Sequence, residues 1–173
     1  MKHWILAFTL TLSQLAHASF TETSSDVLEL ALPAAAASIA YFAEDDTDGL
    51  WQLGYSLGAT TLTTYGLKAL VDKERPNGED NDAFPSGHAA ITFSAAGFLQ
   101  RRYGWHYGLP AYLLASYTGY ARVQSDNHEV VDVLAGAAIG MAFNYFLVSP
   151  HPNVAISPYY DGDTAGLVGQ IHF

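Results

Sequence analysis

Two histidines and an aspartate are the residues in this sequence best suited to catalysis. His88 lies at the start of an apolar stretch, and His128 precedes Asp132 by four positions. A neutral imidazole can act as a nucleophile or transfer a proton. On a shared helix face, a carboxylate one turn away accepts the proton of one ring nitrogen and leaves the other free to attack. The spacing therefore predicts that Asp132 orients His128, with an ordinary surface pair as the alternative.

Three basic side chains are expected near these imidazoles. Lys68 and Arg75 are seven positions apart, which is two helical turns, so both could lean toward one face. Arg122 ends an apolar segment predicted to reach the same level. Clustered cations need an anion, and phosphate suits the planar donors of arginine and the point charge of lysine. The alternative is that each cation is a helix-end charge stabilised by the helix dipole.

Ser86 and Gly87 stand at the start of the helix that carries His88. Free backbone N–H groups at a helix start bind anions, glycine permits close approach, and the serine hydroxyl can donate to a phosphate oxygen. The alternative is that Ser86 is only an N-cap. His88, His128 and Asp132 could also supply three zinc ligands. Because three cations would repel a metal ion, we predict no metal and no cofactor. The acids in this neighbourhood are expected to face solvent: Glu74, Glu79, Asp80, Asp82 and Asp126.

The elements that must position these groups are five apolar segments, each too long for an ordinary strand. They are predicted to be helices, which makes the fold an all-α bundle of about five core helices. Asp26 and Asp48 are expected at or near N-caps. Small residues dominate the segments, as they do where membrane helices pack, so we favour transmembrane helices over a soluble bundle. The segments are 26–43, 49–72, 86–100, 105–122 and 129–148.

Charge placement predicts the orientation of these helices. Arg101 and Arg102 lie together after the third segment, and basic loops are favoured on the cytoplasmic side. Loops 73–85 and 123–128, which carry the chemistry, would then both face the opposite side. We therefore expect a bacterial inner-membrane protein with a periplasm-facing site; the alternative is a soluble periplasmic protein.

The two ends of the chain differ from the bundle. Lys2, a short apolar run and the Ala16-His17-Ala18 pattern resemble a secretory signal, so residues 1–18 are predicted to be cleaved. The helical domain would then cover 19–150. In the tail, 151–173, an Asp-Gly pair at 161–162 lies between two short runs and indicates a hairpin or an irregular segment.

Composition excludes several classes of protein. A length of 173 residues suits one domain, and half of the residues are hydrophobic, although the mean hydropathy is only +0.10. The net charge of −10 argues against nucleic-acid binding. There is no cysteine, which excludes disulfides and thiolate chemistry. The sequence does not predict an oligomeric state.

Together these motifs resemble the type 2 phosphatidic acid phosphatase (PAP2) and vanadium haloperoxidase superfamily. Order and spacing agree in all three parts of the family motif, and Ala121 replaces the serine that precedes the arginine of the third part. The matching positions are Lys68 and Arg75-Pro76, then Pro85-Ser86-Gly87-His88, then Arg122, His128 and Asp132.

The resemblance implies a metal-independent phosphatase that forms a phosphohistidine. In it, His128 attacks phosphorus, Asp132 orients His128, and His88 protonates the leaving oxygen. The phosphate would be held by Lys68, Arg75, Ser86, Gly87 and Arg122. Expected substrates are lipid phosphates or pyrophosphates of the undecaprenyl pyrophosphate, phosphatidylglycerophosphate or phosphatidate type. A soluble acid phosphatase acting on small phosphate esters and a non-catalytic membrane protein that binds anionic lipid are the alternatives.

Overall fold

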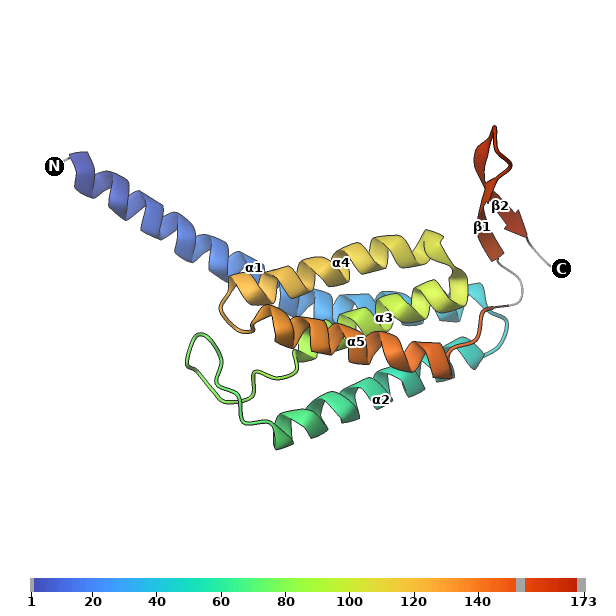
Figure 1. The fold of residues 1–173 in the computed structure, drawn as a ribbon, viewed down its shortest axis with the longest axis horizontal. Helices are drawn as coiled ribbons and strands as arrows, with labels where there is room; N and C mark the ends of the chain where they lie inside the picture. The colour runs from blue at the N-terminus through green and yellow to red at the C-terminus, as the bar shows by residue number, and fades with distance from the viewer. Residues whose placement is uncertain (1, 152–154, 171–173) are drawn as a thin grey trace.

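The fold is a bundle of five helices followed by a β-hairpin, as the sequence predicts (Figure 1). The computed structural model describes residues 2–151 and 155–170. The helices are α1 (Lys2–Ala43), α2 (Asp48–Leu70), α3 (Gly87–Tyr103), α4 (Trp105–Gln124) and α5 (Val130–Leu147), and the strands are β1 (Ala155–Tyr160) and β2 (Ala165–Gln170).

Helix α1 differs most from the sequence prediction. It begins at Lys2 and its first part extends beyond the bundle (Figure 1), so the N-cap predicted at Asp26 is wrong because Asp26 lies inside the helix. Asp48 is in the first turn of α2, as predicted. The predicted signal-peptide cleavage falls within α1 and stays a prediction.

Helix α3 is the centre of the bundle and packs against all four other helices. Glycines let α5 approach it closely. A methyl group built on Gly136 would collide with the carbonyl oxygen of Ser86, and one built on Gly140 would lie 2.8 Å from the backbone nitrogen of Ser94. Small residues four positions apart allow such backbone contact between membrane helices. This contact places the N-terminus of α5 beside the N-terminus of α3.

The interior is built from small side chains, and many of the large apolar side chains face outward. Alanine, serine and threonine dominate the buried residues. A buried polar network links α2, α3 and α5: Ser56 donates to Asn144 Oδ1 at 2.9 Å, and Asn144 Nδ2 donates to the Ser94 carbonyl at 2.9 Å. Large exposed side chains include Leu30, Phe42, Leu62, Leu70 and Phe146. This distribution suits a bundle whose outer surface meets lipid.

Within the described residues, two helices are long and apolar enough to cross a membrane, namely Phe20–Ala43 and Val130–Leu147. The membrane prediction for the other three helices stays a prediction.

At the hairpin end of the bundle, an ion pair joins the connection between α1 and α2 to the end of α3. Arg102 was expected in a connecting loop but lies in the last turn of α3, where it is buried and paired with Glu44 at 2.5 Å. Tyr103 also donates to Glu44.

In the tail, β1 and β2 pair antiparallel around Gly162, whose φ of 101° favours glycine. Of the two alternatives predicted for the tail, a hairpin or an irregular segment, the structure shows the hairpin.

Candidate functional site

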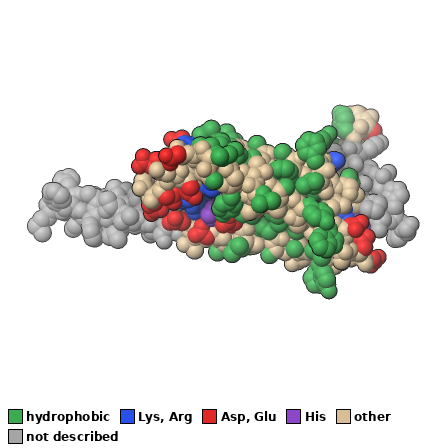
Figure 2. Space-filling model, turned by 90° about the horizontal axis from the view of Figure 1, so that it is seen from below, with side chains coloured by type: hydrophobic (Ala, Val, Ile, Leu, Met, Phe, Trp, Pro, Cys, Tyr) green, Lys and Arg blue, Asp and Glu red, His purple; other side chains and the backbone are tan. Residues whose placement is uncertain are grey.

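The predicted site residues come together at the end of the bundle opposite the hairpin. Loop 71–86, the first turn of α3, the end of α4 and loop 125–129 all meet there, and α1 passes beside them. Figure 2 shows acidic and basic side chains gathered at this end around a histidine, while hydrophobic side chains are scattered over much of the remaining face.

His128 is buried, with 2% of its surface exposed, and its ring is held by the backbone. Nδ1 lies 2.8 Å from the carbonyl oxygen of Ala83. A carbonyl oxygen only accepts, so Nδ1 carries the proton and Nε2 keeps its lone pair. The ring is therefore oriented as a nucleophile requires.

The electrostatic environment of His128 favours the neutral form. Burial lowers the pKa of His128 to about 4, and the hydrogen bond with Ala83 opposes this effect. The positive charges of Lys68, Arg122 and Arg75 lower this pKa further. The charges of all three predicted cations therefore shift the pKa of the same imidazole.

Asp132 does not orient His128 in the way predicted. Its carboxylate accepts from Lys73 Nζ at 2.6 Å and from the Glu129 backbone N–H at 2.9 Å. The spacing argument fails because α5 begins at Val130, so His128 lies before the helix and does not share a face with Asp132. Asp132 instead completes a capping box at the start of α5.

Lys73 is a site residue that sequence reasoning missed. It contacts the fully buried Asp132 and also Glu129, at 2.8 Å. Its backbone pairs with the other arm of loop 71–86, because Lys73 N donates to the Asn81 carbonyl and Ala83 N donates to the Lys73 carbonyl. Lys73 thus ties the loop that carries Ala83 to the N-terminus of α5. In the sequence, the one feature that could have pointed to Lys73 is its place beside Glu74 and Arg75, at the start of the polar loop.

Lys68 and Arg75 converge through a shared acid. Helix α2 ends at Leu70, so Arg75 lies in the loop and the predicted common helix face is wrong. Both side chains instead meet Asp82: Arg75 Nη2 lies 2.6 Å from Oδ1, and Lys68 Nζ lies 3.5 Å from Oδ2. Asp80 also pairs with Arg75, at 2.6 Å. These two acids were expected to face solvent. Each side chain is 46% exposed, and each also offsets the charge of the cations.

Asp82 stays ionised in this arrangement. Burial raises the pKa of its carboxyl group, but hydrogen bonds that involve Asp80 and Arg75 and the charge of Lys68 lower the pKa to about 2. The carboxylate therefore remains available to both cations at any physiological pH.

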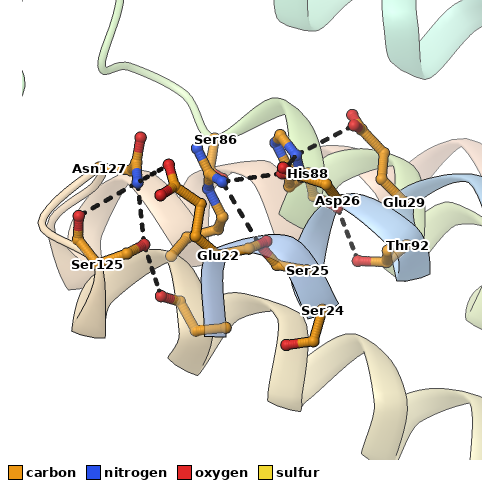
Figure 3. Close-up of polar contacts among 12 residues, drawn as sticks. Glu22, Ser24, Ser25, Asp26, Glu29, Ser86, His88, Thr92, Ser125 and Asn127 are labelled. Carbon is orange, nitrogen blue, oxygen red and sulfur yellow. Dashed lines mark hydrogen bonds and ion pairs between the residues drawn. The ribbon is translucent and has the colours of Figure 1, made fainter. Parts of the chain in front are cut away.

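On the side of the site that faces α1, His88 lies beside Asp26 and Glu29 (Figure 3), and Arg122 contacts the same Asp26. One oxygen of Asp26, Oδ1, accepts from Arg122 Nη1 at 3.2 Å and lies 2.9 Å from His88 Nε2. Glu29 Oε2 lies 3.1 Å from the same His88 nitrogen. Arg122 is buried, and no described residue accepts a hydrogen bond from its Nε. A buried donor without a partner indicates a place for an anionic ligand.

Ser86 and Gly87 form the start of α3, as predicted. Ser86 is buried and is the N-cap, accepting weakly from Ala89 N at 3.4 Å. Its backbone N–H donates to the Asp132 carbonyl at 3.0 Å. A methyl group added to Gly87 would lie 4.0 Å from Lys68 Cε. The start of α3 thus lies beside one of the predicted phosphate-binding cations.

The structure also bears on metal binding. Across the described ranges, 2–151 and 155–170, no group of three or more His, Asp or Glu side chains is placed to hold a metal ion.

The family model of the PAP2 superfamily matches residues 49–154. The chain belongs to the PAP2 superfamily. The matched segment contains every site residue predicted from the sequence, whereas Asp26 and Glu29 on α1 lie outside it.

Curated relatives share this segment. A lipid A 4'-phosphatase of Helicobacter pylori is 35% identical over 115 residues, which are 60% of this chain and 58% of the relative. A lipid A 1-phosphatase of the same species is 33% identical over 114 residues, covering 61% and 60%. The chain thus spans about three fifths of the length of these relatives.

Among solved structures, the crystal structure of Aquifex aeolicus LpxE has the same fold, with a TM-score of 0.64 at 21% identity. The alignment covers 75% of this chain and 83% of that one.

Proposed function

We propose that this protein is a lipid phosphatase that removes a phosphate monoester from a membrane glycolipid of the lipid A type through a phosphohistidine. The observation that carries the proposal is the orientation of His128, whose Nδ1 faces the Ala83 carbonyl, in a ring whose pKa is lowered by the charges of three cations. Lipid A is favoured because relatives at 33–35% identity carry that substrate in their names.

The first half of the reaction follows from the two histidines. The lone pair of His128 Nε2 attacks phosphorus, and the bond between phosphorus and the lipid oxygen breaks. The electron pair passes to that oxygen, which takes a proton from Nε2 of the protonated His88 and leaves that imidazole neutral. Arg75, Lys68 and Arg122 stabilise the charge that develops on the phosphoryl oxygens. Each cation must exchange its present carboxylate partner for a phosphate oxygen.

The second half regenerates the enzyme. A water molecule attacks the phosphohistidine and gives a proton to His88. The bond between phosphorus and His128 Nε2 breaks, its electron pair returns to the nitrogen, and inorganic phosphate leaves. Both imidazoles return to their starting states. No proton or charge is left over.

An apolar groove beside the site supports a lipid substrate. It has a volume of about 380 Å³ and runs along α1 and α2 from Glu29, the residue that contacts His88. A hydrocarbon chain lying there would leave its headgroup near the imidazoles. Its lining residues are Glu29, Leu30, Pro33, Leu57, Thr61 and Ile91.

A substrate panel tests the proposal. Protein in detergent, with chelator present, is assayed for phosphate released from a lipid A-type monophosphate, undecaprenyl pyrophosphate, phosphatidylglycerophosphate, phosphatidate and a chromogenic phosphate ester. We expect chelator-resistant release, fastest from the lipid A-type monophosphate. Binding without release would support the non-catalytic lipid-binding protein. Release only from the small ester, by protein that extracts without detergent, would support the soluble acid phosphatase.

A groove variant tests the lipid contact separately. Thr61→Trp fills the groove, whereas Leu62→Trp places the same ring on an exposed position of the same helix, where Leu62 is 77% exposed. We expect the first variant to lose at least about tenfold in lipid hydrolysis and to keep hydrolysis of the small ester, because a missing lipid contact of about 1.4 kcal/mol is one factor of ten. Equal behaviour of the two variants would remove the groove from the proposal.

A further inference from the structure

His88 has two carboxylate neighbours that belong to none of the three motifs. Asp26 Oδ1 and Glu29 Oε2 lie 2.9 and 3.1 Å from His88 Nε2 (Figure 3). They are three positions apart on α1, so they share a helix face. The contact therefore depends on how α1 lies against α3, and the motif spacing carries no information about it.

These contacts determine which nitrogen of His88 carries its proton. An ionised carboxylate can only accept hydrogen bonds. A ring nitrogen facing two carboxylates must therefore be the donor, whether the imidazole is neutral or charged. The neutral ring is then the Nε2–H tautomer, whose proton points toward Asp26 Oδ1. The same carboxylate oxygen accepts a hydrogen bond from Arg122.

We propose that Asp26 and Glu29 are positioning residues for His88: they hold its transferable proton on Nε2 and so prepare it to protonate the leaving oxygen. The catalytic part of this statement rests on the proposed function, in which His88 is the proton donor. The tautomer itself does not depend on it.

Charge around His88 explains why two acids are needed. Burial lowers the pKa of His88 to about 4, and the charge of Arg122 on α4 acts in the same direction, as does that of Arg75 in loop 71–86. Asp26 opposes these cations. Glu29 is the other acid in contact with the ring, and its side chain is 22% exposed, whereas that of Asp26 is 56% exposed. When the phosphate displaces the exposed Asp26 from Arg122, Glu29 can keep its contact with the imidazole.

The test uses the full chain in detergent micelles with ¹⁵N-labelled histidine. Imidazole ¹⁵N shifts distinguish the two neutral tautomers, and His88→Gln assigns the signal. We expect wild-type His88 to be the Nε2–H tautomer. In Asp26→Asn/Glu29→Gln, the tautomer preference should be lost and the titration midpoint should fall by about one unit. Asp45→Asn, an exposed acid at the other end of the bundle, is the control and should change neither signal. An unchanged tautomer and midpoint in the double variant would overturn the proposal.

A kinetic measurement separates positioning from a merely structural role. Because the donor must be protonated, loss of the carboxylates should move the alkaline limb of the pH–rate profile down by about one unit and lower turnover about tenfold at a fixed pH above the limb. The charge-conserving variants Asp26→Glu and Glu29→Asp should restore the limb. A uniform loss at every pH would contradict positioning. If wild-type protein releases no phosphate from any ester, the proposed function fails, and the ¹⁵N result still decides the role of the two acids.

Discussion

Replacing Lys73 with methionine should destabilise the protein and disturb the nucleophile without touching it. The variant keeps the length of the side chain and removes the ammonium group that contacts the buried Asp132 at 2.6 Å. Asp132 would keep only its hydrogen bond from the Glu129 backbone N–H. Loop 71–86 would lose its tie to α5, and with it the fixed position of the Ala83 carbonyl that orients His128.

The size of the effect follows from burial. Removing one partner of a buried ion pair costs about 3–5 kcal/mol. Because the Lys73 side chain is 27% exposed and one hydrogen bond to Asp132 survives, we expect a smaller loss, about 2–3 kcal/mol. For a chain of this size that corresponds to a fall in Tm of about 4–12 °C.

Thermal unfolding in detergent, followed by near-ultraviolet circular dichroism, measures the loss of stability, and hydrolysis of a small phosphate ester measures kcat. Lys73→Arg keeps the charge and should lose less than about 1 kcal/mol. Lys73→Met/Asp132→Asn should lose less than the sum of the single variants, because no unpaired carboxylate remains buried. A Lys73→Met protein with wild-type Tm and kcat would refute this account of Asp132.

Three further results are expected. Because the free enzyme holds His128 at a pKa of about 4, the acid limb of the kcat/KM profile should lie near pH 4. Lys68→Met removes a cation that lowers this pKa and should move the acid limb upward; a pH–rate profile checks both. Gly136→Ala should cost about 1–3 kcal/mol in thermal unfolding, because its methyl group has no room against α3; a wild-type Tm would show that α5 does not approach α3 so closely. Arg102→Met should cost about 3–5 kcal/mol by leaving the buried charge of Glu44 without a cation, with hydrogen bonds from Tyr103 and the Gly49 N–H remaining. It should leave kcat of the folded fraction unchanged, and a changed kcat would mean that the two ends of the bundle are coupled.

Local patterns predicted the elements well, because apolar runs separated by polar, Gly- and Pro-containing loops fix where helices can form. The five helices and the hairpin around Gly162 follow from such patterns. The start of α1 could not be predicted, because the apolar leader and the following segment join without a helix-breaking residue. Pro33, which could have ended a helix, lies inside α1.

Motif spacing predicted that Lys68, Arg75 and Arg122 act on His128, but it did not predict the hydrogen-bond and ion-pair partners of the site residues. The partner of Asp132 depends on α5 beginning at Val130, a boundary that spacing does not fix. Asp26 and Glu29 reach the site only through the packing of α1 against α3 and α4. Their common helix face was visible in the sequence, but nothing there indicated which helix it would meet.

The central claim is that His128 becomes phosphorylated during turnover. The most direct measurement is rapid quenching of the enzyme with ³²P-labelled lipid phosphate under conditions that preserve acid-labile phosphohistidine, followed by mapping of the labelled peptide. We predict label on the peptide that contains His128, and neither label nor phosphate release in a folded His128→Ala protein. Label on another residue, or phosphate release by His128→Ala, would contradict the account.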